Sequence, residues 1–152
     1  MSLKKPYFIN PTSFKQARDV DEMFGILFEH LSATVANVRH IVIPSFGSDE
    51  SVATGDGTVG ITIPEEMNGY VLTDALASVY VPSTTGNINV QIRLERAGVD
   101  TDIGDLVVIL EDEYYGTKTL KKVVYKGDII FADVNLAGSG ALGLFTVLTF
   151  TE

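Results

Sequence analysis

The sequence predicts a mainly β protein: a jelly-roll-like antiparallel β-sandwich of about eight strands, preceded by an N-terminal arm and an α-helix. The clearest observation is the stretch 87–95, NINVQIRLE, in which Ile88, Val90, Ile92 and Leu94 alternate with polar residues. A period of two places the four aliphatic side chains on one face of a strand and the polar ones on the other. Short apolar runs separated by turn residues continue to residue 151 without helical stretches between them, which argues against a βαβ fold.

Composition restricts the classes of function. The chain has 152 residues, a net charge of −9 and no cysteine, so disulfides and thiol chemistry are excluded. Residues 41–152 hold six Lys or Arg against sixteen Asp or Glu, and a surface this acidic disfavours binding to nucleic acid. We also expect no membrane span and no secretory signal, because no stretch approaches the ~20 apolar residues of a span and no apolar run precedes Asn10.

Three parts of the chain are expected: an arm and helix over 1–40, a connecting segment over 41–57 and the sandwich over 58–152. Pro6 and Pro11 favour an extended arm, and Ser13 with Gln16 forms a capping-box pattern at the start of a helix. Large apolar residues then recur at helical spacing and form a stripe that ends at Val38. The main members of this stripe are Phe14, Phe24, Leu27, Phe28, Leu31 and Val35. The stripe either packs on the sheet of its own subunit or forms a seam between identical helices.

The expected strands lie at 41–43, 58–63, 70–81, 87–95, 106–110, 120–125, 129–134 and 142–151. The segment 45–57 is polar and rich in glycine, and we expect it to be the boundary between arm and body. In 70–81 the expected inner face is the odd-numbered series from Val71 to Val81, and 98–105 is expected to be a loop. In the last strand Leu144, Thr146, Leu148 and Phe150 should oppose Phe145, Val147 and Thr149.

No group of residues predicts catalysis or metal binding. His30 and His40 are too few for a zinc site, and the acidic loop from Asp100 to Asp105 lacks the glycine and the terminal glutamate of an EF-hand. Adjacent acids at 111–113 are a poor basis for a glycosidase pair, and no nucleotide-binding or nucleophile-elbow motif is present. We therefore expect no enzymatic activity, no cofactor and no metal, with Tyr114 and Tyr115 as a candidate ligand-facing loop.

The body resembles a β-sandwich module of tailed-bacteriophage virion proteins. The matching motifs are GDG at 55–57, ITIP at 61–64, MNG at 67–69, VYVPSTTG at 79–86, VQI at 90–92, GD at 127–128 before the strand 129–134, GL at 143–144 and VLTF at 147–150. Each motif by itself consists of turn residues and the strand residues beside them, and the resemblance lies in the order and spacing of the motifs over about residues 52–151. The segments 112–122 and 14–38 depart from it.

The resemblance implies a non-enzymatic structural protein of the virion, a capsid decoration (cement) or head-fibre subunit that works as a homotrimer beside the major capsid or other virion proteins. In that arrangement the N-terminal region, with the apolar stripe, contacts the virion. The alternatives are a receptor- or glycan-binding module of a phage tail or fibre, and a cellular sugar-binding domain.

Overall fold

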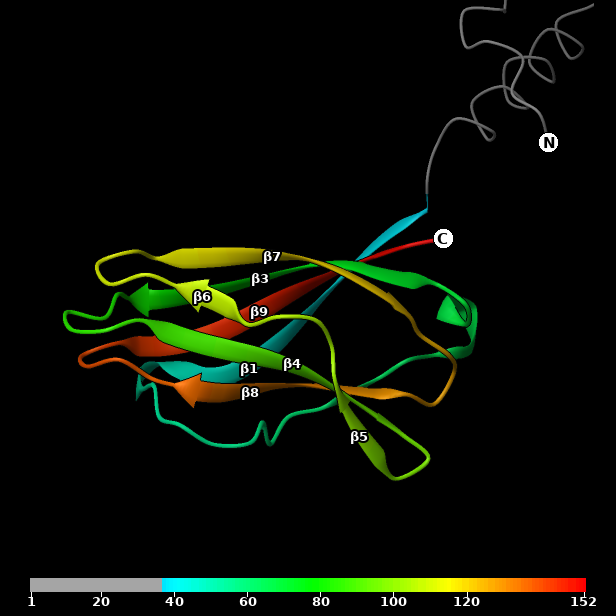
Figure 1. Cartoon of the computed structure of the whole chain (residues 1–152), viewed down its shortest axis with the longest axis horizontal. Coiled ribbons are helices and arrows are strands. Elements are labelled where there is room, and N and C mark those ends of the chain that lie inside the picture. The colour runs from blue at the N-terminus through cyan, green and yellow to red at the C-terminus, as the bar shows by residue number, and fades with distance from the viewer. Residues whose placement is uncertain (1–36) are drawn as a thin grey trace, which may run out of the picture. The chain divides into compact units, whose positions relative to one another are not determined.

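The computed structural model describes residues 37–152, and these form a β-sandwich (Figure 1). Nine strands follow one another along the described chain, with one short 3-10 helix between β2 and β3. They are β1 (Val38–Ser51), β2 (Ile61–Thr62), β3 (Val71–Val81), β4 (Ile88–Arg96), β5 (Val99–Asp102), β6 (Val107–Ile109), β7 (Tyr115–Val123), β8 (Ile129–Leu136) and β9 (Leu142–Thr151), and the 3-10 helix η2 spans Glu65–Met67. The chain divides into Met1–Asn37 and Val38–Glu152, so the sandwich begins at Val38.

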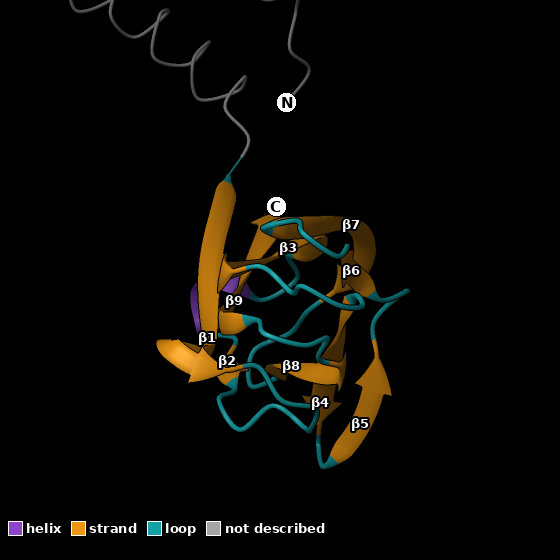
Figure 2. Cartoon of the chain, turned by 90° about the vertical axis from the view of Figure 1, so that its left-hand side faces the viewer, coloured by secondary structure: helices purple, strands orange, loops and turns teal. Residues whose placement is uncertain are grey.

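Two antiparallel sheets make up the sandwich. The first has the strand order β1-β9-β3-β7; the second has the order β2-β8-β4-β5, with β6 also paired to β4. Successive strands mostly alternate between the two sheets, as in a jelly roll, and the end-on view shows the layers (Figure 2). The predicted mainly β, jelly-roll-like sandwich is therefore confirmed.

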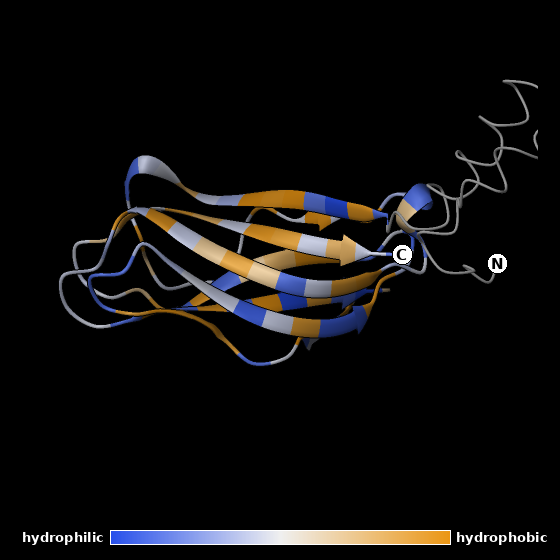
Figure 3. Ribbon diagram, turned by 90° about the horizontal axis from the view of Figure 1, so that it is seen from above, coloured by the Kyte–Doolittle hydropathy of each residue, from blue (hydrophilic) through white to orange (hydrophobic). Residues whose placement is uncertain are grey.

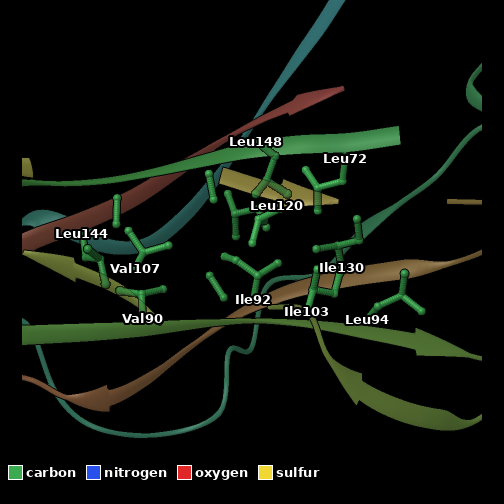
Figure 4. Packing of buried hydrophobic residues seen from close by; sticks show 14 of the residues in the cluster. Leu72, Val90, Ile92, Leu94, Ile103, Val107, Leu120, Ile130, Leu144 and Leu148 are labelled. Carbon is green, nitrogen blue, oxygen red and sulfur yellow. The ribbon is translucent and has the colours of Figure 1, made fainter. Parts of the chain in front are cut away.

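The core lies between the sheets and is aliphatic. Ile88, Val90, Ile92 and Leu94 of β4 are buried as predicted and belong to one cluster with residues of the opposite sheet such as Leu148. Figure 4 shows Ile92 and Leu148 pointing into the space between the sheets. The two predicted series of β9 lie on opposite faces, and the structure places Leu144, Thr146, Leu148 and Phe150 in the core, where all four are fully buried. Coloured by hydropathy, the strands carry apolar stretches interrupted by hydrophilic positions (Figure 3).

Several boundaries differ from the sequence-based expectation. Residues 41–51 of the expected connecting segment belong to the first sheet, because β1 pairs with β9 from Val38 to Ser51, and only residues 52–57 lie between β1 and the rest of the sandwich. Val38 is thus a strand residue and not the end of the helical stripe. The expected strand at 58–63 is reduced to the two residues of β2, and the expected loop at 98–105 contains β5, which pairs with β4. Strand β7 begins five residues earlier than expected, at Tyr115.

The inner face of β3 changes sides within the strand. Leu72 is buried in place of Val71 and Thr73. Ala75, Ala77 and Val79 are buried as expected, whereas Val81, at the end of the strand, is 40% exposed. The physical reason is a bulge between Leu72 and Asp74 that interrupts the pairing with both neighbouring strands. A bulge adds one residue and shifts the alternation that follows it, which a period-two pattern does not anticipate.

Candidate interaction surface

The outer face of the sheet β1-β9-β3-β7, called here the outer apolar face, is made of four straight cross-strand rows. The register of the four strands sets the rows. In the order β7, β3, β9, β1 they are Tyr115, Ser78, Phe145 and Pro44; Thr117, Leu76, Val147 and Val42; Thr119, Asp74, Thr149 and His40; and Val123, Val71, Thr151 and Val38. Each position alternates with a buried neighbour in most of its strand, so these side chains point away from the core.

The outer apolar face is exposed although much of it is apolar. Val42 is 52% exposed and Tyr115 is 60% exposed. Tyr80 extends the face, with its ring centroid 5.7 Å from that of Phe145. Asp74 is the only acidic residue in the four rows, and β9, a central strand, has no charged residue in its whole length. In an acidic body this face is where charge is depleted.

The outer face of the second sheet is built differently. Arg93 donates from Nε to Asp133 Oδ2 at 2.6 Å and from Nη1 to Asp100 Oδ1 at 2.9 Å, and its guanidinium lies 4.4 Å from the Phe131 ring centroid. The hydrogen bond to Asp133, and to a smaller extent that to Asp100, raises the pKa of Arg93 above its usual value. Asp133 also accepts from the amide of Gly57 at 2.6 Å, which fastens the segment after β1 to β8. On this face the Arg93–Asp133 pair is largely covered, with side chains 17% and 9% exposed, and the Asp100 carboxylate, 58% exposed, lies at its surface.

A buried carboxylate fixes the turn between β7 and β8. The Asp128 side chain is 3% exposed, accepts from Arg96 Nε at 2.8 Å and Nη2 at 2.6 Å, and accepts from the amide of Tyr125 at 2.8 Å. The Arg96 guanidinium also lies 4.6 Å from the Tyr125 ring centroid. The hydrogen bond from Arg96, opposed in part by burial, lowers the pKa of Asp128 below its usual 3.8 and raises the pKa of Arg96.

The end of the sandwich opposite Val38 and the C-terminus carries the β3–β4, β6–β7 and β8–β9 loops (Figure 1). Buried Ser83 ties them together. Its hydroxyl lies 2.9 Å from the Thr85 carbonyl and 3.1 Å from the Ser139 carbonyl, either of which can accept its one hydrogen, and it accepts from the Ser139 amide. The Ser83 carbonyl accepts from the Asp112 amide at 2.9 Å. Gly138, at φ +64°, is placed so that a Cβ would meet the Ser83 hydroxyl at 2.3 Å. The three loops therefore form one cross-linked end of the molecule, called here the loop end.

The predicted ligand-facing tyrosines lie at the loop end. Tyr114 and Tyr115 are 56% and 60% exposed, at the junction of the β6–β7 loop with β7. Tyr115 belongs to the outer apolar face, and the Tyr114 carbonyl accepts from the amide of Val79, so both residues have a place in the sheet architecture.

The acidic loops are used in ion pairs and local hydrogen bonds. Asp100 pairs with Arg93, and Asp105 pairs with Lys118 at 2.9 Å. Glu111 accepts from the amide of Gly86 at 2.9 Å. Within residues 37–152 no group of three or more His, Asp or Glu is placed to hold a metal ion. His40 Nδ1 lies 3.1 Å from Thr149 Oγ1 on the outer apolar face, and no helix in this part of the chain is long and apolar enough to cross a membrane.

The predicted oligomer and virion interface lies outside the described residues. Its members are Phe14, Phe24, Leu27, Phe28, Leu31 and Val35, and His30 lies in the same segment. The outer apolar face is not among the sites predicted from the sequence. A signal was present in β9, where both alternating series of LGLFTVLTFT lack charge, whereas a strand with one wet face normally carries polar residues on it.

Comparison with known proteins adds a likeness of fold. No protein-family model matches the chain, and no curated protein matches it. Among solved structures, the globular domain of the zebrafish complement 1qA protein is similar, with 10% sequence identity, a TM-score of 0.45, and coverage of 77% of this chain and 96% of that chain. Likeness at this level carries no argument about function, so the class of the protein, an antiparallel jelly-roll-like sandwich, rests on its own strand pairing.

Proposed function

We propose that the protein is a non-enzymatic structural subunit of a tailed-bacteriophage virion, a capsid decoration or head-fibre protein. The observation that carries the proposal is that the two ends of the sandwich differ. The chain enters at Val38, beside the C-terminus, and the cross-linked loop end lies at the opposite end (Figure 1). A subunit attached through the segment before Val38 would present a stable acidic body and a fixed set of loops to the outside.

The turn motifs of the resemblance occupy conformations that support it. Gly69, Gly86 and Gly127 all have φ between +78° and +89°, where glycine is the residue with least strain. Each lies in a connection between strands: Gly69 follows η2, Gly86 lies in the β3–β4 loop, and Gly127 precedes β8. The motifs on which the resemblance depends are therefore turn determinants of this sandwich.

The proposal includes a homotrimer whose N-terminal region contacts the virion. Six large apolar residues between Phe14 and Val35 exceed what one short helix needs against its own sheet, and burying each is worth ~1.5–3 kcal/mol. Residues 1–40 hold five Lys or Arg against four Asp or Glu, so this region meets its copies without the repulsion of the acidic bodies. The major capsid protein or another virion protein is the proposed partner, and the virion is the proposed location.

Locating the protein in purified particles tests the function directly. Antibody labelling and quantitative mass spectrometry of virions should place it on the head at hundreds of copies. Its absence from purified virions would overturn the proposal. For the N-terminal contact, the informative deletion ends at Asn37, because β1 begins at Val38 and a deletion to residue 40 removes strand residues. The shortened protein should no longer attach to particles that lack their own copies.

The second candidate function is a glycan- or receptor-binding module of a tail or fibre. Tyr114 and Tyr115 favour it, since exposed aromatic faces at the fixed loop end suit stacking on a sugar. Glycan-array binding that is lost in Tyr114→Ala and Tyr115→Ala, but kept in Tyr125→Ala, would support this function. Tyr125 is a matched control because it is 46% exposed and lies at the other end, between β7 and β8.

A further inference from the structure

We propose that the outer apolar face is the surface through which the sandwiches of neighbouring copies of this chain meet. The proposal deepens the proposed homotrimer: each body turns this face toward the three-fold axis and contacts its two neighbours there, in addition to the contact proposed for the N-terminal region. Its starting point is a contrast between two sheets of the same molecule. The outer face of the second sheet carries Arg93, Asp100 and Asp133 in ion pairs, whereas the four rows of the outer apolar face contain one acidic residue, Asp74.

The charge distribution indicates which partner binds the outer apolar face. Residues 41–152 carry sixteen acidic and six basic residues, so two bodies brought together over most of their surface repel each other. The outer apolar face is an exception, with Val42, Leu76 and Val147 in one uncharged row and Phe145 in the next. Neighbouring copies present the same charge-poor face, so the contact brings together a single carboxylate from each copy, that of Asp74. A strongly basic partner would find few carboxylates on this face to pair with.

The size of the face is sufficient for a contact. Four strands spaced about 4.8 Å apart, over about nine residues that rise about 3.4 Å each, present roughly 500 Å². Three such faces turned toward one axis bury roughly 1,500 Å² in the whole trimer, to which the proposed contact of the N-terminal region adds. The apolar part of each face is smaller than its full area, because the row of Thr119, Asp74, Thr149 and His40 is polar. The two adjoining rows through Phe145 and Val147 form one exposed apolar patch, and such patches mark interaction sites.

The position of Val38 makes this contact compatible with a shared N-terminal assembly. Val38 lies in the last row of the face, opposite Thr151, on the edge strand β1. If copies are related by an axis parallel to the strands, every Val38 lies at the same end of the assembly. The segments that precede Val38 then leave the bodies from one end, and the loop ends all point the other way.

A matched pair of exposed valines tests the proposal in the full-length protein. Val42 is 52% exposed on the outer apolar face, and Val99 is 64% exposed on β5 of the second sheet. Val42→Glu should raise the dissociation constant measured by sedimentation velocity by about tenfold or more, and Val99→Glu should leave it within about twofold. Far-UV circular dichroism establishes that both variants fold. Equal dissociation constants for the wild type and Val42→Glu would overturn the proposal.

The absence of cysteine provides a second measurement that does not require a destabilising charge. Val42→Cys and Val99→Cys each introduce a single thiol. In the oligomer a bulky maleimide should label Cys at position 99 at least about tenfold faster than Cys at position 42, and dilution below the dissociation constant should remove most of the difference. Equal labelling rates at high protein concentration would overturn the proposal even if the N-terminal region alone holds the copies together. Because these assays use purified protein, a protected face in a protein absent from virions would refute the proposed function and leave this inference standing.

Discussion

Replacing Asp128 by alanine should destabilise the sandwich by about 2–3 kcal/mol. The Asp128 side chain is 3% exposed and accepts three hydrogen bonds, two from Arg96 and one from the amide of Tyr125. Breaking a buried ion pair costs about 3–5 kcal/mol when the remaining charge stays buried. The Arg96 side chain is 41% exposed and regains water, so the cost is lower, and most of what remains is the unpaired Tyr125 amide at about 1–3 kcal/mol.

Thermal and urea unfolding of Asp128→Ala, Arg96→Met and the double variant form the assay. At about 4 °C per kcal/mol, the melting temperature of Asp128→Ala should fall by about 8–12 °C. The coupling free energy between the two residues should be about 1–2 kcal/mol. A coupling below about 0.3 kcal/mol would show that the ion pair contributes nothing and that the loss comes from the Tyr125 amide alone.

The same pair predicts a dependence of stability on pH. The hydrogen bond from Arg96 lowers the pKa of Asp128 in the folded protein below the 3.8 of the unfolded chain. A lowered carboxyl pKa stabilises the folded state above the unfolded pKa, and that stability is lost as the pH falls through the folded pKa. The difference in unfolding free energy between the wild type and Asp128→Asn should therefore be constant from about pH 5 to 8 and shrink below about pH 4. A difference that does not change down to about pH 2 would refute the role of the charge.

Three further substitutions are expected to give distinct outcomes. Thr146→Val should stabilise the protein by about 1 kcal/mol in urea unfolding, because the buried Thr146 hydroxyl has no partner in the described structure and valine has the same shape. Gly116→Ala should lower the free energy of unfolding by about 1–3 kcal/mol, because the new Cβ would lie 2.0 Å from the carbonyl oxygen of Val108. Gly47→Ala is the control: its Cβ would lie 3.8 Å from the nearest atom, so its melting temperature should change little. Asp133→Ala should speed amide hydrogen exchange in the segment after β1, since it removes the acceptor that fastens this segment to β8, and unchanged exchange there would contradict that role.

The sequence alone determined which strands have one buried face. In β4 an uninterrupted alternation of aliphatic and polar residues is sufficient, because the strand period of two leaves one way to bury such a pattern, whereas both series of β9 are uncharged and the pattern alone does not choose between its faces. Turns that contain glycine could also be predicted from the sequence, since a backbone at positive φ locally favours glycine. The lack of a nucleophile–base or metal-binding motif could likewise be judged from the sequence, because it depends only on residue types and their spacing.

Tertiary structure decided what depends on pairing between distant segments. The strand at Val38–Ser51 is polar and glycine-containing in its second half, and only its pairing with β9 makes all of it part of the sandwich. The change of face in β3 follows from a bulge that no period reveals. The outer apolar face exists because strands β1, β9, β3 and β7, which are not consecutive in the chain, align their outward residues in register. A period of two separates two faces of a strand, but burial of one and exposure of the other are set by which neighbours the fold places beside them.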